Sequence, residues 1–183
     1  MPRMKLDIKD RLILVNQCRI LRALYPDEAG YYSKAETVFS RGYELNYGWV
    51  SEFVDPEPMD EKECREVHDI LSMFRALGDS YNQLADKSGI EEREVRFLGF
   101  DGNNEGRQLG YADFIINQEG GYQESKVGVA GDGLNSHMPT LDTYRRMLKV
   151  WKPLKEKYTL KKADIEKIVA ERIHPENRKK PKS

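Results

Sequence analysis

The chain has 183 residues and a formal net charge of −1, and 39% of its residues are hydrophobic and 33% are charged. This length and composition predict one domain with a sizeable core and a well-solvated surface. The near-zero charge excludes a global field that would attract nucleic acid or anionic lipid. The sequence lacks the roughly 18 consecutive apolar residues of a membrane span, and its charged N-terminus lacks the apolar region of a signal peptide.

Residues 7–25 are expected to form the first helix, with Asp7 as its N-cap and Pro26 as its end. Its apolar residues cover a wide arc of the helix rather than one face: Leu12, Ile13, Leu14, Val15, Cys18, Ile20, Leu21, Leu24 and Tyr25. A helix that is apolar over so wide an arc is expected to be central or to pack on two neighbours.

A second helix is expected from a cap at Asp27 to about Leu45, where residues 46–48 break the pattern. Residues 49–53 then form a short aromatic anchor. An acidic, proline-bearing connector follows, and Asp60 with Glu63 has the spacing of a capping box. This box predicts the start of a third helix over about residues 61–86, whose apolar residues recur at spacings of three and four.

Residues 93–121 hold the densest mixture of apolar, turn-forming and polar residues in the chain. Residues 94–100 are too short a run to separate a strand from a helix. The turn that follows contains Asn103 and Asn104, either of which can cap a helix over residues 105–118. An acid at Glu105 would favour the positive end of that helix dipole.

The glycine-rich segment 120–139 is longer than an ordinary connection, so we expect either a functional loop, such as a lid, or a mobile one. Thr140 or Asp142 starts the next helix, which Pro153 ends. A last helix over residues 162–173 is expected to bury Ile165, Ile168, Val169 and Ile173.

These elements predict an all-α, single-domain bundle of about six helices, with one short extended segment near 94–100 as an option. We expect a short extension over residues 1–6, the helical domain over 7–173, and a disordered basic tail over 174–183. Cys18 and Cys64 lie far apart in helical patterns and fit no disulfide framework or metal spacing. Each is expected to fill the core, as suits a protein of the reducing cytoplasm.

No catalytic motif stands out. His68 and Asp69 resemble a metal-binding doublet, but adjacent residues on a helix diverge by about 100°. The glycine-rich segment has no G-x-x-x-x-G-K-[ST] phosphate loop, and no serine stands in a nucleophile elbow. The sequence therefore predicts no catalytic residues, no metal and no cofactor.

The best polar cluster lies in the turn near the middle of the chain: Asp101, Asn103, Asn104, Glu105 and Arg107. In one interpretation these residues form a concave patch at a helix N-terminus that binds a polar ligand or the backbone of a partner. In the other they cap a helix, and an arginine-to-acid contact holds the turn against the core. Both interpretations stay open on the sequence.

Two further features concern partners. Residues 174–183 carry four basic residues and one acid, which suits either a solubilising terminus or weak, salt-sensitive nucleic-acid binding. The chain also has ten tyrosines and two tryptophans, many of them between Tyr25 and Trp49. Any that are exposed would mark a protein interface.

The segments RLILVNQCRIL, SRGYEL, REVRFLGFDGNNEGRQLGY and YRRMLKVWKP resemble the YfbU family of bacterial proteins over residues 7–172. The resemblance implies an all-helical domain of the bacterial cytoplasm that self-associates, and it supplies no catalytic residues. Some relatives carry a ribbon-helix-helix-like DNA-binding segment ahead of this domain, which implies a regulatory or antitoxin-like setting. With about six residues ahead of the matching region, we expect no such segment here.

We therefore expect a non-enzymatic module that forms a homo-oligomer and binds a protein partner in a regulatory setting such as stress or toxin–antitoxin control. One alternative is an enzyme or small-ligand binder that uses the 101–107 turn under the 120–139 segment as a lid. The other is weak nucleic-acid binding through the basic tail.

Overall fold

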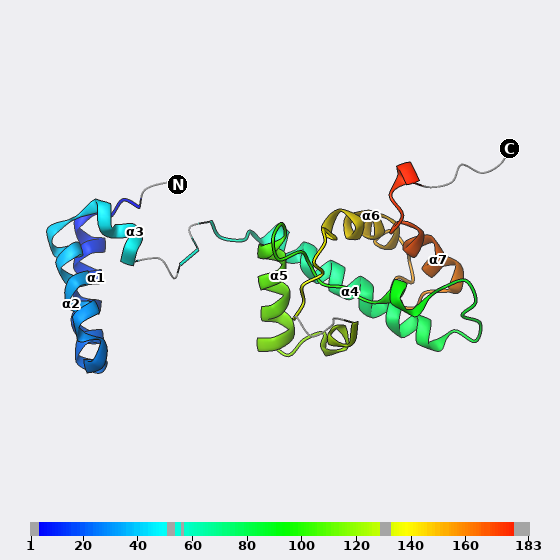
Figure 1. The fold of residues 1–183 in the computed structure, drawn as a ribbon, viewed down its shortest axis with the longest axis horizontal. Helices are drawn as coiled ribbons and strands as arrows, with labels where there is room; N and C mark the ends of the chain where they lie inside the picture. Colours follow the sequence, from blue (N-terminus) through cyan, green and yellow to red (C-terminus); the bar gives the residue numbers. More distant parts are fainter. Residues whose placement is uncertain (1–3, 51–53, 56, 129–132, 178–183) are drawn as a thin grey trace. The chain divides into compact units, whose positions relative to one another are not determined.

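The computed structural model describes residues 4–50, 54–55, 57–128 and 133–177. Within these residues it has seven α-helices and no strand, and one isolated parallel bridge joins Phe100 to Asn135. The helices are α1 (Ile8–Leu24), α2 (Ala29–Arg41), α3 (Tyr47–Val50), α4 (Glu61–Gln83), α5 (Gly106–Asp113), α6 (Leu141–Trp151) and α7 (Lys162–Ala170) (Figure 1). The predicted all-α fold is confirmed.

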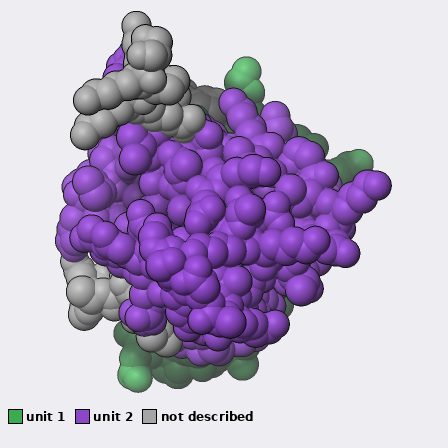
Figure 2. Space-filling model, turned by 90° about the vertical axis from the view of Figure 1, so that its right-hand side faces the viewer, with its two compact units in different colours: residues 1–58 green, residues 59–183 purple. Residues whose placement is uncertain are grey.

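The helices fall into two compact units. Unit 1 is Met1–Pro58 and unit 2 is Met59–Ser183, and Figure 2 colours them separately. Each unit has its own cluster of buried hydrophobic side chains. Each is therefore described by itself.

Helix α1 begins and ends where the sequence predicts. The Asp7 carboxylate accepts hydrogen bonds from the Lys9 and Asp10 backbone N–H groups, and the Asp10 side chain accepts one from the Asp7 N–H. This reciprocal arrangement satisfies donors that a helix N-terminus otherwise leaves open. Pro26 then starts a short 3₁₀ turn, Pro26–Glu28.

The predicted second helix is corrected at both ends. Helix α2 starts at Ala29 rather than at Asp27, since the 3₁₀ turn occupies the preceding residues. It ends before Gly42, which takes a left-handed conformation with φ of 71° and so closes the helix. The expected break at 46–48 is also wrong, because Tyr47–Val50 forms α3. Of the expected aromatic anchor, residues 51–53 lie outside the described part of the chain.

The core of unit 1 is small, and it lies where α1, α2 and α3 meet: Val15, Cys18, Ala35, Val38, Phe39, Tyr47 and Val50. The expectation that α1 is central or packs on two neighbours is not met within the unit. It packs along α2 and leaves Leu12, Ile20 and Leu24 more than half exposed. Unit 1 thus keeps much of its apolar surface outside its own core.

Helix α4 is the central element of unit 2, where it contacts α5, α6 and α7 (Figure 1). Nine of its residues are buried, including Val67, Ile70 and Leu71. Aromatic rings from three segments meet beside it, with Phe74 and Tyr144 at a centroid distance of 4.9 Å. The predicted apolar residues along this helix form one side of the core of unit 2.

The predicted capping box of α4 is confirmed. Asp60 accepts a hydrogen bond of 2.8 Å from the Glu63 N–H, and the Glu63 carboxylate accepts one of 3.1 Å from the Asp60 N–H.

We expect Asp60→Ala to lower the free energy of unfolding of unit 2 by about 1 kcal/mol, and Asp60→Ser to retain most of the stability of the unchanged chain. Trp151 fluorescence in a Trp49→Phe background measures this, because each unit holds one of the two tryptophans. Equal stability of the alanine and serine variants would contradict the cap's contribution.

The remaining helices of unit 2 follow the predicted order, with adjusted ends. Helix α5 is followed directly by a π-helical turn, Phe114–Gln118. The predicted helix over 105–118 is therefore α-helical in its first part and π-helical in its last part. Helix α7 ends at Ala170, and Ile173, which was expected in the core, is 54% exposed beyond it. In the described part of the chain, no helix is both long enough and apolar enough to cross a membrane. Residues 178–183 of the predicted tail lie outside that part.

Candidate functional site

The central turn is anchored by the segment that precedes α6. Phe100 donates a hydrogen bond of 2.9 Å from its N–H to the Leu134 carbonyl, and the Ser136 N–H donates one of 3.0 Å to the Phe100 carbonyl. Gly99 has a φ of +90°, and a Cβ atom there would lie 1.9 Å from the Leu134 carbonyl oxygen. Only glycine lets the two segments approach this closely.

Tyr144 of α6 forms hydrogen bonds with the backbone just before the turn, at Leu98 and Gly99. Its hydroxyl donates to the Gly99 carbonyl at 3.0 Å and accepts from the Leu98 N–H at 3.2 Å. Burial raises the pKa of Tyr144 to about 12, so the hydroxyl keeps its proton at neutral pH. Its role here is to satisfy two backbone groups in the core.

Glu105 is buried, and its carboxylate joins the turn to the N-terminus of α6. One oxygen, Oε1, accepts from the N–H groups of Thr140 and Leu141 at 2.9 and 2.8 Å. The other, Oε2, accepts from the Asp101 N–H at 3.0 Å and lies 3.1 Å from the Thr140 hydroxyl. A negative charge at this position also suits the positive end of the α6 dipole. Glu105 thus caps α6, rather than only favouring the dipole of α5 as the sequence suggests.

Asp101 is also buried, and its side chain accepts hydrogen bonds from other residues of the turn. Its carboxylate accepts a hydrogen bond of 3.0 Å from the Asn103 N–H and another from the Asn104 side-chain amide. These two bonds, the one from Asn104 first, lower the pKa of the Asp101 carboxyl. The ionised form is therefore the one that the folded turn prefers.

This preference predicts an acid-dependent loss of stability. Because the folded pKa lies below the unfolded value of about 3.9, the contribution of Asp101 is fully present above that value. It is lost as the pH falls through the lower folded pKa. We expect the denaturation midpoint of unit 2 to fall between about pH 5 and about pH 3, and to fall less steeply in Asp101→Asn. Parallel pH profiles of the two proteins would contradict this assignment.

Three members of the predicted cluster lie on the surface. Asn104 turns back to Asp101, and Arg107 forms an ion pair of 3.1 Å with Glu63 at the start of α4. The expectation that Asn103 or Asn104 caps the following helix is wrong, since the N-cap of α5 is Glu105 and no side chain caps it. The structure thus brings Asp101, Asn103, Asn104 and Glu105 together, while Arg107 contacts another helix. Ligand binding by the five residues stays a prediction.

The 120–139 segment, expected as a lid or a mobile loop, is packed onto the turn over its last part. Leu134 is buried, and the Asn135 side-chain oxygen accepts from the N–H groups of Gly102 and His137 at 3.1 and 3.0 Å. The described residues after the gap at 129–132 therefore form part of the scaffold of the turn.

His68 and Asp69 point to different neighbours, as their positions on α4 predict. The His68 Nε2 atom lies 3.2 Å from the Tyr111 hydroxyl, and Asp69 pairs with Lys152 at 2.5 Å. One turn further along α4, Ser72 lies 2.9 Å from the Tyr122 hydroxyl. Among the described residues, no group of three or more His, Cys, Asp or Glu side chains could hold a metal ion.

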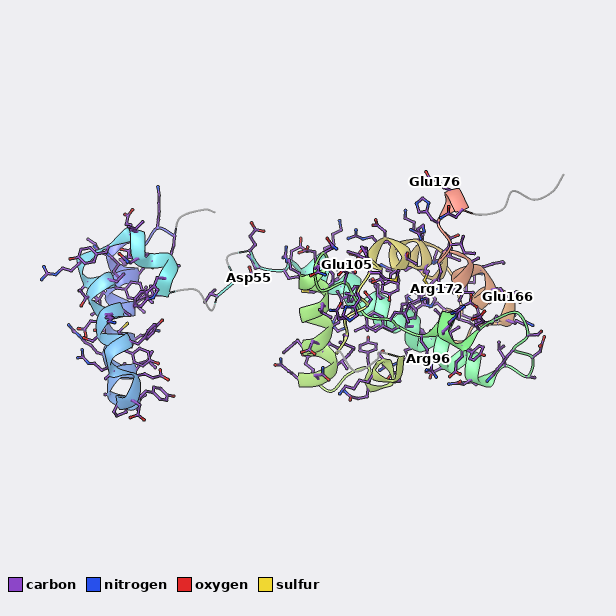
Figure 3. The ribbon with its side chains drawn as sticks, in the orientation of Figure 1. Asp55, Arg96, Glu105, Glu166, Arg172 and Glu176 are labelled. Atoms are coloured by element: carbon purple, nitrogen blue, oxygen red, sulfur yellow. The ribbon has the colours of Figure 1, made fainter. Side chains whose placement is uncertain are left out.

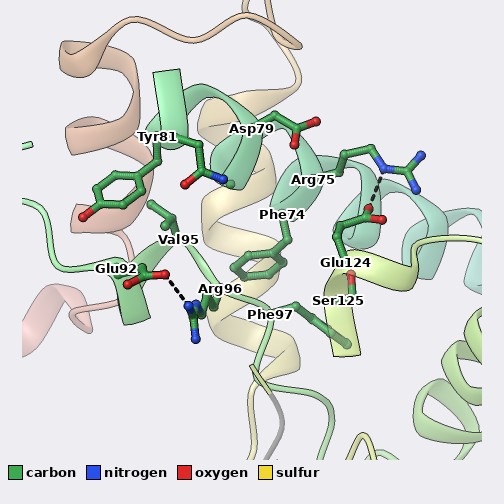
Figure 4. A pocket seen from close by; sticks show the side chains of 12 residues that line it. Phe74, Arg75, Asp79, Tyr81, Glu92, Val95, Arg96, Phe97, Glu124 and Ser125 are labelled. Carbon is green, nitrogen blue, oxygen red and sulfur yellow. Dashed lines mark hydrogen bonds and ion pairs between the residues drawn. The ribbon is translucent and has the colours of Figure 1, made fainter. Parts of the chain in front are cut away.

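A cavity of about 190 Å³ lies beside α4 in unit 2, and no sequence motif pointed to it (Figure 4). Its inner wall is apolar, with Phe74, Val95 and Phe97. Ion pairs lie on it: Arg75 contacts Glu124 at 2.5 Å, and Arg96 contacts Glu92. Asp79 also lines the cavity, so its three acids and two arginines leave an excess of one negative charge.

Unit 1 presents a second type of surface. A groove of about 420 Å³ lies along α1 and α2, and most of its lining is apolar or aromatic: Leu14, Gln17, Cys18, Leu21, Tyr31, Tyr32, Ala35, Phe39 and Val50. Next to this groove, α1 exposes a further row of aliphatic side chains. The aromatic content of residues 25–49 pointed to this region, but the groove itself depends on how α1 and α2 pair.

The chain as a whole matches a family model. Residues 4–170 match the model described as the YfbU domain. The match covers most of the chain and reaches from α1 in unit 1 to α7 in unit 2. It confirms the resemblance drawn from the sequence segments.

Proposed function

The chain belongs to the YfbU family, and from this premise and the surface of unit 1 we propose that it is a non-enzymatic interaction module. It self-associates and binds a protein partner in the bacterial cytoplasm. The regulatory setting, in stress or toxin–antitoxin control, comes from the family resemblance. The observation that carries the proposal is the apolar surface that α1 leaves uncovered within unit 1.

This surface is large for so small a unit. Ile8, Leu12, Ile20 and Leu24 are each between 58% and 75% exposed, and Leu45 is 88% exposed. Unit 1 spans 58 residues, and seven of those that the structure describes form its buried core. Domains of about 60 residues bury a smaller share of their surface than larger ones, so they gain most from a partner. Large exposed apolar patches mark protein interaction sites.

The small-ligand alternative at the 101–107 turn has weaker support. The two buried acids of that turn, Asp101 and Glu105, are already occupied by hydrogen bonds from the chain itself. What a ligand could meet is the exposed part of the cluster, Asn103, Asn104 and Arg107. Arg107 also contacts Glu63, so binding would compete with that ion pair.

Two purifications test the proposal. Two copies of the full chain with different tags, co-expressed, should purify together through either tag. The tagged chain, passed through lysate of its own host with and without nuclease, should retain a protein in fixed ratio under both conditions. If neither copy nor partner is retained, the proposal fails. Material that disappears with nuclease would instead support the basic-tail alternative.

A further inference from the structure

We infer that α1 pairs with α1 of a second copy of this chain, antiparallel, about a two-fold axis that passes beside Asn16. The inference rests on the proposed self-association and names its surface and its geometry. It concerns unit 1 alone, whose two main helices lie side by side in Figure 1.

The surface is a row of five exposed residues spaced four apart on α1: Ile8, Leu12, Asn16, Ile20 and Leu24. We call this row the outer face. Successive members are displaced by about 40° around the helix, so they form one continuous ridge. Cys18, which α1 buries, lies about 160° around the helix from Asn16, and the other buried residue, Val15, lies about 100° from it, so the middle of the row points away from the core. Among the described residues of unit 1, none covers the outer face, whose aliphatic side chains stay more than half exposed.

The outer face is symmetric about its middle residue. In a two-fold interface, residue i of one copy contacts residue j of the other and the reverse contact is also made. An axis beside Asn16 pairs Leu12 with Ile20 of the second copy at the centre of the contact, and Ile8 and Leu24, about 80° to either side of Asn16, flank it. Asn16 of one copy meets Asn16 of the other, and an amide side chain can donate and accept a hydrogen bond at the same time. One polar residue in an apolar row also fixes the register of two helices.

Charge selects the antiparallel orientation and a second copy as the occupant. Both ends of α1 carry mixed charges, but residues 5–11 hold three basic and two acidic side chains, whereas residues 22–28 hold one basic and two acidic side chains. An antiparallel pair places the end of net charge +1 in each copy near the end of net charge −1 in the other. A parallel pair would place like charges together and would also align the two helix dipoles unfavourably. The face is therefore complementary to itself.

The test measures the mass of the full chain by sedimentation velocity. We expect a dimer for the unchanged chain and at least about 100-fold weaker association for Ile20→Glu, because the carboxylate would be buried against Leu12 without a partner. Leu45→Glu is the matched control, since Leu45 is equally aliphatic and more exposed but lies outside the outer face. It should remain a dimer. Far-UV circular dichroism checks that both variants keep their helix content.

A charge-swap pair tests the orientation. Leu12→Lys alone should also dissociate, but mixing it with Ile20→Glu should restore a one-to-one heterodimer, because residues 12 and 20 meet only in the antiparallel pairing. No rescue, together with a dimer that survives Ile20→Glu, would overturn the assigned surface while leaving self-association intact. A wild-type chain that is monomeric at every concentration would overturn both this inference and the proposed self-association.

Discussion

Gly99→Ala is expected to lower the free energy of unfolding of unit 2 by more than about 4 kcal/mol, the largest effect of any single substitution considered for this chain. The added Cβ would lie 1.9 Å from the Leu134 carbonyl oxygen and 2.5 Å from its carbon, and both are backbone atoms that cannot rotate away. The φ of +90° adds the strain of a conformation that side chains rarely adopt. The Phe100 and Ser136 hydrogen bonds to the neighbouring segment would have to break.

Gly89→Ala is the matched control for this substitution. Gly89 has a similar φ of +79°, but a Cβ atom there would meet no atom within 4 Å. It should therefore cost only about 1 kcal/mol, the conformational part of the effect. Chemical unfolding followed by Trp151 fluorescence in the Trp49→Phe background measures both. Equal losses for the two variants would show that the close approach of residues 99 and 134 contributes nothing.

Glu105→Ala is expected to cost unit 2 about 3–5 kcal/mol, because it leaves three backbone N–H groups without an acceptor in a buried place. Glu105→Gln should cost less. Its amide oxygen can replace Oε1 for Thr140 and Leu141, while its NH₂ group would face the Asp101 N–H, a donor against a donor. The expected order of stability is wild type, then glutamine, then alanine, in the same fluorescence assay.

Glu166→Ala on α7 is the control for the loss of a glutamate. Figure 3 labels both residues, and Glu166 is exposed on its helix. Substitution there should change the stability of unit 2 by less than about 0.5 kcal/mol. If Glu105→Ala were as mild as Glu166→Ala, the carboxylate would not be the cap of α6 that its hydrogen bonds indicate.

Local signals predicted much of this fold. The start of α1 at Asp7 and the start of α4 at Asp60 each depend on residues within three positions, and both capping boxes are present. The end of α1 before Pro26 depends on the chemistry of one residue. The apolar stripe of α4 is a spacing, so it could be read without knowing what packs against it.

Other features depend on residues far apart in the chain. The polar cluster at 101–107 was visible, but the role of Glu105 was not, because its acceptor atoms serve Thr140 and Leu141 more than 30 positions later. The requirement for glycine at Gly99 likewise comes from Leu134. In α1 the sequence showed a wide apolar arc, from which we expected burial. The structure of unit 1 covers one side of that arc and leaves the outer face exposed.

The central claim, that this chain self-associates through unit 1, is tested most directly by the mass of the purified full chain in solution. Light scattering after size-exclusion chromatography, from about 1 µM to about 100 µM, covers the range in which a functional dimer should form. We predict the mass of a dimer, twice 21.3 kDa, that shifts to a monomer in Ile20→Glu. A constant monomer mass over the whole range would contradict the account.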